Sequence, residues 1–112
     1  MLVHPNTLAE FNAWANRRLY AACGTLTPDG IAKNRDAFFK SILGTLNHIH
    51  LVDILYRERL EGQSSTFKSL DEILHQDFQS LSAHQVEEDQ RWIELTKDID
   101  AGTMDELSLI HI

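Results

Sequence analysis

Three long stretches of this chain repeat apolar residues at three- and four-residue spacing, and this periodicity restricts the possible folds more than any other feature. The stretches span residues 7–24, 36–61 and 69–98. Only two prolines and five glycines interrupt the 112 residues, and no convincing strand-like alternation occurs. Because amphipathic helices bury their apolar stripes against one another, the sequence predicts an all-α helical bundle that forms a single domain.

The first stretch carries signals for both ends of a helix. Thr7 offers a hydroxyl for the N-cap and Glu10 follows three residues later, which is the pattern of a capping box. Gly24 is suited to end the helix, and the segment 27–30 (Thr-Pro-Asp-Gly) is typical of a turn. We expect Trp14 and the apolar stripe of this helix to lie in the core; the stripe comprises Leu8, Phe11, Ala15, Leu19 and Ala22.

The second stretch predicts a helix from about Asp36 to Glu61 with a broad apolar face. Gly44 lies inside it, and a glycine in a helix often permits the close approach of a neighbouring helix. Gly62 and the polar residues after it indicate a loop. The residues of the expected core face are Phe38, Ile42, Leu46, Ile49, Val52, Leu55, Tyr56 and Leu60.

The third stretch opens with a second capping box, from Ser69 to Glu72, and predicts a helix that continues to about Asp98. Its section 84–91 is polar apart from one valine. We expect this section to project into solvent or to cover a polar opening. The acidic run Glu87-Glu88-Asp89 predicts a solvated face.

The width of the apolar face on the second helix favours a bundle of four helices rather than three. After Ile99 the chain offers only the segment 100–112, which is too short for another full helix and carries no capping signal. We therefore expect the single domain 1–112 to be truncated before its fourth helix. The segment 107–112 resembles translated adapter sequence, so we expect these residues not to be native.

Charge argues against nucleic acid as a partner. Seventeen acidic and ten basic side chains give a net charge of −7, and phosphate backbones repel such a surface. The basic pair Arg57 and Arg59 has a glutamate beside each arginine. The composition therefore excludes direct nucleic-acid binding as a favoured function.

The chain has no apolar run that could span a bilayer and no features of a signal peptide, so we expect a cytoplasmic protein without a membrane partner. Its single cysteine, Cys23, cannot form an internal disulfide and suits a reducing compartment. Cys23 lies near the carboxyl end of the first predicted helix, where nothing activates a thiol, so we expect it to be unreactive.

Two blocks of residues carry a resemblance to a known family. The first is 11–19 (Phe-Asn-Ala-Trp-Ala-Asn-Arg-Arg-Leu) in the first helix. The second is 38–48 (Phe-Phe-Lys-Ser-Ile-Leu-Gly-Thr-Leu-Asn-His), which is followed by Asp53 and by 60–62 (Leu-Glu-Gly). At this separation the two blocks resemble the first- and second-helix signatures of the DinB/YfiT-like family of metal-dependent four-helix bundles.

The resemblance implies an up-down-down-up four-helix bundle of which this chain contains the first three helices. It also implies a divalent metal ion, zinc or nickel, held by three histidines. His48 matches the ligand on the second helix; the other two belong to a His-x-x-x-His pattern in the fourth helix, which this sequence lacks. We give no ligand role to His111, the only histidine beyond residue 84.

The family's characterised members imply a metal-dependent enzyme, a thiol-dependent S-transferase or a hydrolase, that acts on a small-molecule substrate. The metal ion would lower the pKa of a bound thiol or water and so create a nucleophile at neutral pH. A low-molecular-weight thiol is the expected co-substrate, and a homodimer the expected assembly. The alternative is a non-catalytic helical module that dimerises or binds a partner without a functional metal.

The other polar residues of the second and third helices leave alternatives open. His50 lies about 200° around the helix from His48, so we expect it on the surface. A site formed by His48 with His84 is conceivable, but no spacing selects it. Asp53 falls inside the apolar arc, where a carboxylate needs a partner. It either accepts hydrogen bonds from the first helix or acts as a general base or a residue that orients a ligand.

Overall fold

The computed structural model describes residues 4–35, 39–64, 67, 69 and 71–97. Within these ranges the chain forms helices and no strands, which confirms the all-α class. No helix in this part of the chain is long and apolar enough to cross a membrane. The helices of the described ranges are α1 (Pro5–Cys23), the short α2 (Pro28–Ala32), α3 (Ile42–Leu60) and α4 (Phe78–Thr96).

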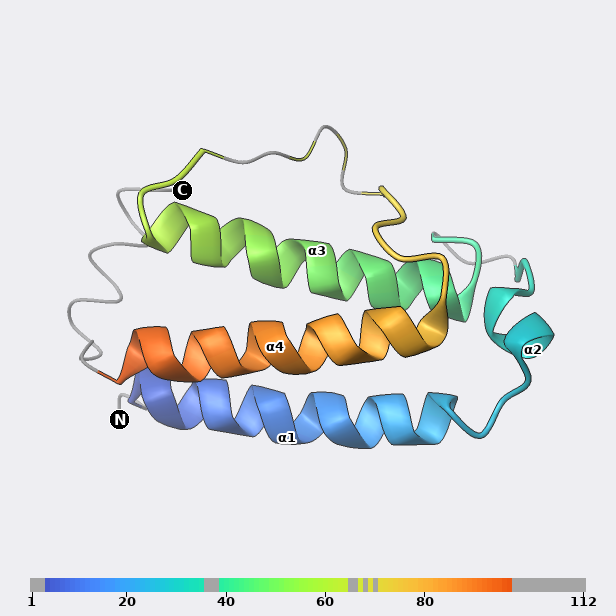
Figure 1. The fold of residues 1–112 in the computed structure, drawn as a ribbon, viewed down its shortest axis with the longest axis horizontal. Helices are drawn as coiled ribbons and strands as arrows, with labels where there is room; N and C mark the ends of the chain where they lie inside the picture. Colours follow the sequence, from blue (N-terminus) through green and yellow to red (C-terminus); the bar gives the residue numbers. More distant parts are fainter. Residues whose placement is uncertain (1–3, 36–38, 65–66, 68, 70, 98–112) are drawn as a thin grey trace.

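The three long helices lie side by side, with α4 between α1 and α3 (Figure 1). The chain runs along α1 in one direction and returns along both α3 and α4, so that α3 and α4 are parallel. The short α2 packs on α3. The four-helix topology stays a prediction, because the described part contains three long helices. The predicted truncation, His111 and the segment 107–112 lie outside the described residues.

Helix α1 begins three residues earlier than the capping box predicted. His4 is the N-cap: its Nδ1 accepts a hydrogen bond from the backbone N–H of Asn6 at 3.1 Å. Pro5 occupies the first turn, where its fixed φ suits a helix and its missing N–H costs nothing. The turn predicted at 27–30 was also wrong, because Thr27 caps α2, with its hydroxyl accepting from Gly30 N–H at 3.0 Å.

Helix α3 begins at Ile42, later than predicted, and its N-cap is Ser41. The Ser41 hydroxyl accepts from the backbone N–H of Gly44 at 2.9 Å. A Cβ at Gly44 would collide with the carbonyl oxygen of Phe39. The glycine therefore permits the approach of the chain's own preceding turn, and not of a neighbouring helix as we expected. This turn brings Phe39 over the first half of α3.

Helix α4 begins at Phe78 rather than at the predicted capping box at Ser69. Its N-cap is Asp77, whose carboxylate accepts from the N–H of Ser80 at 2.9 Å. The incoming loop is held by Asn47, a fully buried side chain on α3. The Asn47 amide donates to the carbonyl of His75 and accepts from its N–H, both at 2.9 Å. These two hydrogen bonds hold the segment before α4 in an irregular backbone conformation that is incompatible with a helix.

The apolar core is small and lies where α1 ends and α3 and α4 begin. Leu46 and Leu81 are almost fully buried there, beside the ring of Tyr20. The Tyr20 and Phe78 rings stack with their centroids 5.8 Å apart. Further along the helices the interior becomes polar, and this polar section is the part of the molecule that bears on function.

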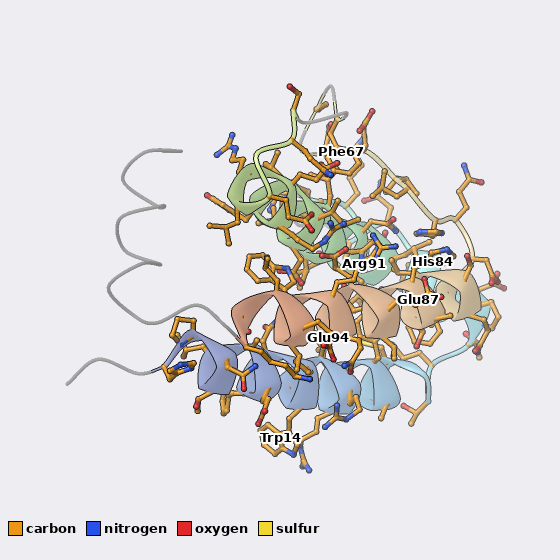
Figure 2. The ribbon with its side chains drawn as sticks, turned by 60° about the vertical axis from the view of Figure 1, so that its left-hand side comes forward. Trp14, Phe67, His84, Glu87, Arg91 and Glu94 are labelled. Carbon is orange, nitrogen blue, oxygen red and sulfur yellow. The ribbon has the colours of Figure 1, made fainter. Side chains whose placement is uncertain are left out.

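The expected core stripe of α1 was wrong, because much of it faces away from α4. Phe11 is 63% exposed and Leu8 54%, whereas the residues that α1 buries are Pro5, Ala9, Ala13, Asn16 and Tyr20. Trp14, which we also expected in the core, is 48% exposed and points away from α4 (Figure 2). The small side chains let α1 approach α4 closely, and the polar Asn16 finds a partner on α4.

Helix α3 shows a similar departure from the predicted face. Leu46 is buried as expected, but Tyr56 is 44% exposed. The buried polar residues on this helix are Asn47, His50 and Arg57. Buried polar side chains persist only where their hydrogen bonds are made, so the packing of α1 and α3 against α4 is governed by polar contacts as well as by apolar ones.

Candidate functional site

The polar interior is organised around Gln85, a side chain on α4 that is 1% exposed. Its amide nitrogen donates to Oδ2 of Asp53 on α3 at 3.0 Å and to Oδ1 of Asp89 on α4 at 2.9 Å. The Asn16 amide on α1 also donates to Asp89, at 3.0 Å and 3.3 Å to its two oxygens. Three helices thus contribute to one network, which we call the Gln85 network.

The orientation of the Gln85 amide fixes the tautomer of His50. Because the NH₂ group lies between two carboxylates, the carbonyl Oε1 must face the other way. There it lies 3.4 Å from the Tyr20 hydroxyl and 3.2 Å from Nδ1 of His50. Both groups have to donate to an oxygen that only accepts, so His50 carries its proton on Nδ1. Its Nε2 is consequently the nitrogen with the lone pair.

Removal from water displaces the pKa values of the ionisable groups in this network. It raises the pKa of Asp53 to about 6, against a partial lowering by the hydrogen bond from Gln85. It also raises the pKa of Asp89, and the neighbouring Glu88 adds to that shift. Burial lowers the pKa of His50 to about 4, which keeps its imidazole neutral. Near neutral pH the network therefore holds a neutral histidine beside carboxyl groups that retain protons unusually strongly.

A cavity of about 260 Å³ opens onto the network between α1 and α4. Its polar walls include Asp89 and Gln85 from α4, and Asn16 and Arg17 from α1. Asp53 is not part of this wall and lies behind the Gln85 amide. Asp89 is consequently the carboxyl group of the network that a small molecule in the cavity can reach.

A buried ion pair lies beside the network. Arg57 on α3 and Glu88 on α4 are 7% and 4% exposed, and Nε of the arginine donates to Oε2 of the glutamate at 2.5 Å. Nη1 of Arg57 also donates to Glu61 at 2.5 Å. The pair ties α3 to α4, and it contradicts the solvated face predicted for Glu87-Glu88-Asp89. Only Glu87 of that run is exposed; it shares an exposed side of α4 with His84, Arg91 and Glu94 (Figure 2).

His48, the predicted metal ligand, lies on a different side of α3 from the Gln85 network. Its imidazole is half-buried and stacks on the ring of Phe39, with the centroids 4.0 Å apart. Among the described residues no group of three histidine, cysteine, aspartate or glutamate side chains is placed to hold a metal ion. Since a closed zinc site takes four donors, His48 and its described neighbours do not on their own fit such an ion.

Comparison with known proteins identifies the chain from its sequence. The family model described as "DinB family" matches residues 1–106. The chain belongs to the DinB family. No curated protein and no solved structure matches the chain. The match confirms the family predicted from the two helix blocks, and it covers α3 with His48 as well as the polar interior of this DinB protein.

Of the other histidines of this DinB chain, His50 does not take its predicted position, whereas His84 lies on the exposed polar section of the helix as predicted. His50, which we expected on the surface, is 2% exposed, because α3 turns this side toward Gln85 on α4. His84 is exposed and stacks on His75, with the ring centroids 4.2 Å apart. The His75 and His50 centroids are 5.6 Å apart. A metal ion lies in the plane of each imidazole that binds it, so two stacked rings cannot share one ion in this arrangement.

We had expected Asp53 to find its hydrogen-bond partner on the first helix, but its main partner lies on α4. Gln85 is that partner, and the Asn12 amide of α1 adds a smaller effect on the Asp53 pKa. The backbone carbonyl of Asp53 also accepts from the Trp92 indole N–H at 3.0 Å. Burial raises the pKa of the Asp53 carboxyl to about 6, but the side chain is not part of the cavity wall, so its role as a general base stays a prediction.

Sequence reasoning missed the central residue of the site, Gln85, and misplaced Asp89. A signal existed: the buried residues of α4 are Leu81, Gln85, Glu88, Asp89 and Thr96, and the spacings 81–85, 85–89 and 89–96, of four, four and seven residues, put them on one side of a helix. Because most of these residues are polar, a search for apolar stripes does not detect them. Cys23 behaves as predicted: its thiol is free and half-buried, and burial raises its pKa.

Proposed function

We propose that this DinB-family chain is a metal-dependent enzyme, a thiol-dependent S-transferase or a hydrolase, that acts on a small molecule in the cavity beside Asp89. His48 supplies one ligand of the divalent metal ion, zinc or nickel. The observation that carries the enzymatic part of the proposal is the Gln85 network. It combines two carboxyl groups of raised pKa, a neutral histidine and an adjoining cavity, and it thereby joins proton-transfer groups to a place for a substrate.

A purely structural role explains this interior less well. Burying carboxylates costs several kcal/mol unless they are well compensated, and apolar residues of similar size fill such space at lower cost. Perturbed carboxyl groups that border a cavity are typical of active sites. Asp89 meets this description, since its pKa is raised and its side chain lines the cavity.

The residues of the cavity have separate roles in the proposal. Asp89 exchanges a proton with the thiol or water that attacks the substrate. Gln85 holds Asp89 and Asp53 at either side of its amide, and so positions both carboxyl groups. Arg17 lies in the same wall and attracts an anionic group of the substrate.

The metal ion requires donors beyond those of the described residues. Because His48 contributes a single imidazole, the remaining ligands have to come from outside the described ranges. The steps assigned to Asp89 and Gln85 do not depend on the geometry of that ion. We place the protein in the cytoplasm, where the Cys23 thiol stays reduced and low-molecular-weight thiols are abundant.

Two measurements test the proposal. A protein that also carries the His-x-x-x-His ligands implied by the family is expected to keep zinc or nickel through dialysis, and His48→Ala in it is expected to lose the metal, whereas His84→Ala keeps it because that exposed histidine is not a ligand. The 112 residues alone are expected to retain no stoichiometric metal, because they supply only one of the three ligands. Turnover of a chlorodinitrobenzene with glutathione, and of a nitrophenyl ester with water, is expected to fall at least tenfold in Asp89→Asn. Equal metal content in both histidine variants would remove His48 from the site; unchanged turnover would remove Asp89.

The second candidate function is a non-catalytic module that associates through its helices. The observation that favours it is the exposed apolar side of α1, with Phe11 63% and Trp14 48% exposed. The two accounts differ in what Asp89→Asn does. A module without catalysis shows no turnover in either form, and its association is the same with Asp89 or Asn at this position.

A further inference from the structure

The cavity between α1 and α4 presents only part of the polar network to a ligand. Both hydrogens of the Gln85 amide are already used, by Asp53 at 3.0 Å and by Asp89 at 2.9 Å. The Gln85 carbonyl is used as well, because it faces His50 and the Tyr20 hydroxyl. At the back of the cavity the Asp89 carboxyl is therefore the group that keeps hydrogen-bonding capacity for a small molecule.

The two oxygens of Asp89 are not equivalent. Oδ1 accepts from Gln85 at 2.9 Å and from Asn16 at 3.0 Å. From the described residues Oδ2 receives only a longer hydrogen bond, from Asn16 at 3.3 Å. In a protonated carboxyl the carbonyl oxygen is the better acceptor, so Oδ1 is the carbonyl oxygen and the proton lies on Oδ2. The acid form of Asp89 thus offers an O–H donor to the occupant of the cavity.

A carboxylate is the group that suits this donor, because a cation lies in the same wall. The Arg17 side chain lines the cavity, and its charge partly offsets the raised pKa of Asp89, which places the guanidinium near that carboxyl. A guanidinium and an adjacent O–H group together match a carboxylate, whose two oxygens each accept from one of them. A carboxamide of the same shape has one acceptor oxygen, and an ammonium group has none.

The surroundings of Asp89 make the binding of a carboxylate take up a proton. The charged and titratable groups that face Asp89 are Tyr20 and Arg17 on α1, Asp53 on α3 and Glu88 on α4. Burial and Glu88 favour the protonated form of Asp89, and Arg17 favours the ionised form. A carboxylate bound to Arg17 would offset that cation and add a negative charge. Since two carboxyl groups in hydrogen-bond contact cannot both ionise, they share one proton.

The rest of the wall suits a compact apolar body. Tyr20 and Ala21 on α1 and Val86 on α4 line the cavity. Its volume of about 260 Å³ lies just below the range of roughly 300–1,000 Å³ that is usual for ligand pockets. The occupant is therefore smaller than a drug-sized ligand, with a body of the size of a single ring.

We propose that the cavity binds a small carboxylic acid with an apolar body, whose carboxylate is held by Arg17 and shares a proton with Oδ2 of Asp89. Such acids are the substrate class of the proposed enzyme, and this assignment rests on the proposed function. Binding of this kind adds no step to the proposed chemistry. It makes recognition depend on pH, because the acid is held most tightly where Asp89 keeps its proton.

NMR titrations with benzoate and benzamide test the carboxylate site, because the two probes have nearly the same shape and differ in charge. We expect benzoate to bind at least tenfold more tightly at about pH 6 and to shift the side-chain amide signals of Asn16. Arg17→Gln is expected to remove most of this preference. Arg18→Gln is the matched control, because Arg18 lies over the Trp14 ring, 5.2 Å from its centroid, and Trp14 points away from α4.

The dependence of affinity on pH tests the shared proton. Between about pH 6 and 8 the benzoate affinity is expected to fall by up to tenfold per pH unit, because the proton that binding requires becomes scarcer. In Asp89→Asn the amide donates without taking up a proton, so this fall is expected to disappear while benzoate still binds. Circular dichroism checks that the variant folds, and the slope of the unmodified chain decides the question if it does not.

Three results would each overturn the proposal. They are equal affinities for benzoate and benzamide, no binding of benzoate at about 10 mM, and a benzoate affinity that does not change with pH in the unmodified chain. The proposed function fails differently: benzoate binds as expected, but neither thiol transfer nor hydrolysis occurs. Turnover without benzoate binding would overturn the carboxylate site alone.

Discussion

The two sides of α1 reverse the pattern of a simple amphipathic helix, in which large apolar residues are buried and polar residues face solvent. The side that packs on α4 carries small and polar residues, with Asn16 bound to Asp89 at 3.0 Å. The side that faces solvent carries Phe11 and Trp14. The difference shows that specific hydrogen bonds to α4, together with close approach at Ala9 and Ala13, determine how α1 is rotated.

The largest effect is expected from breaking the buried ion pair on the inner side. Arg57→Ala leaves the carboxylate of Glu88, which is 4% exposed, without its partner. Removing one member of a buried pair typically costs about 3–5 kcal/mol of the free energy of unfolding, and we expect a loss of this size in urea denaturation. Lys97→Ala is the control, because it breaks the exposed pair with Glu94 and is expected to leave the urea midpoint unchanged.

A somewhat smaller effect is expected at the centre of the network. Gln85→Leu keeps the volume but removes the donor shared by Asp53 and Asp89 and the acceptor for Tyr20 and His50. We expect a loss of about 2–4 kcal/mol, since several polar groups lose a partner at once. The same denaturation curves on Gln90→Leu supply the comparison, because Gln90 bonds only at the surface, to Glu94. An equal effect of both changes would mean that the network contributes no particular stability.

The Asp53 and His50 pKa shifts predict opposite dependences of stability on pH. Between pH 4 and 6 folded Asp53 keeps a proton that the unfolded chain has released, so its contribution to stability falls as the pH rises. His50 behaves in the opposite sense: between pH 6.5 and 4 the unfolded chain gains a proton that the folded chain refuses, so its contribution falls as the pH falls.

Single substitutions separate these two contributions. Relative to the unmodified chain, Asp53→Asn is expected to be more strongly destabilised by acid, because one group that offsets His50 is gone. His50→Gln is expected to become relatively more stable at pH 4 than at pH 6. Urea midpoints measured across this range give both slopes. If both substitutions changed the dependence of the urea midpoint on pH in the same direction, the pKa values of Asp53 and His50 would not be shifted in opposite senses.

The smallest effect on folding is expected on the outer side. Phe11→Gln replaces a ring that is 63% exposed, so the stability of the isolated monomer is expected to change by no more than about 0.5 kcal/mol. Chemical denaturation at low protein concentration measures this monomer stability. A loss comparable to that of Gln85→Leu would show that Phe11 packs within the chain, and the contrast between the two sides would fail.

The sequence predicted the fold class and the family, and it identified the helical stretches better than their ends. Pro5, Ser41 and Asp77 determine where the helices begin, and two of these starts compete with capping boxes that look equally good in the sequence. The rotation of each helix could not be predicted from apolar periodicity, because Asn16, His50 and Gln85 are buried through partners on other helices. Such partners are distant in the sequence: 73 residues separate Asn16 from Asp89.

The role of His48 as a metal ligand stays a prediction from the family resemblance, since the described residues place it beside Phe39 rather than among other donors. Asp53 could be singled out because a carboxylate inside an apolar arc needs a partner. The identity of that partner, Gln85, could not, because glutamine is neutral and leaves no charge pattern in the sequence.

The central claim is that the buried polar interior holds proton-transfer groups. An NMR titration of the aspartate side-chain carboxyl carbons tests this claim most directly. The Asp53 signal, assigned with Asp53→Asn, is expected to titrate near pH 6, because removal from water raises its pKa. Asp89 is expected to titrate above the ordinary aspartate range as well. Midpoints near the ordinary value of 3.8 for both groups would contradict the account.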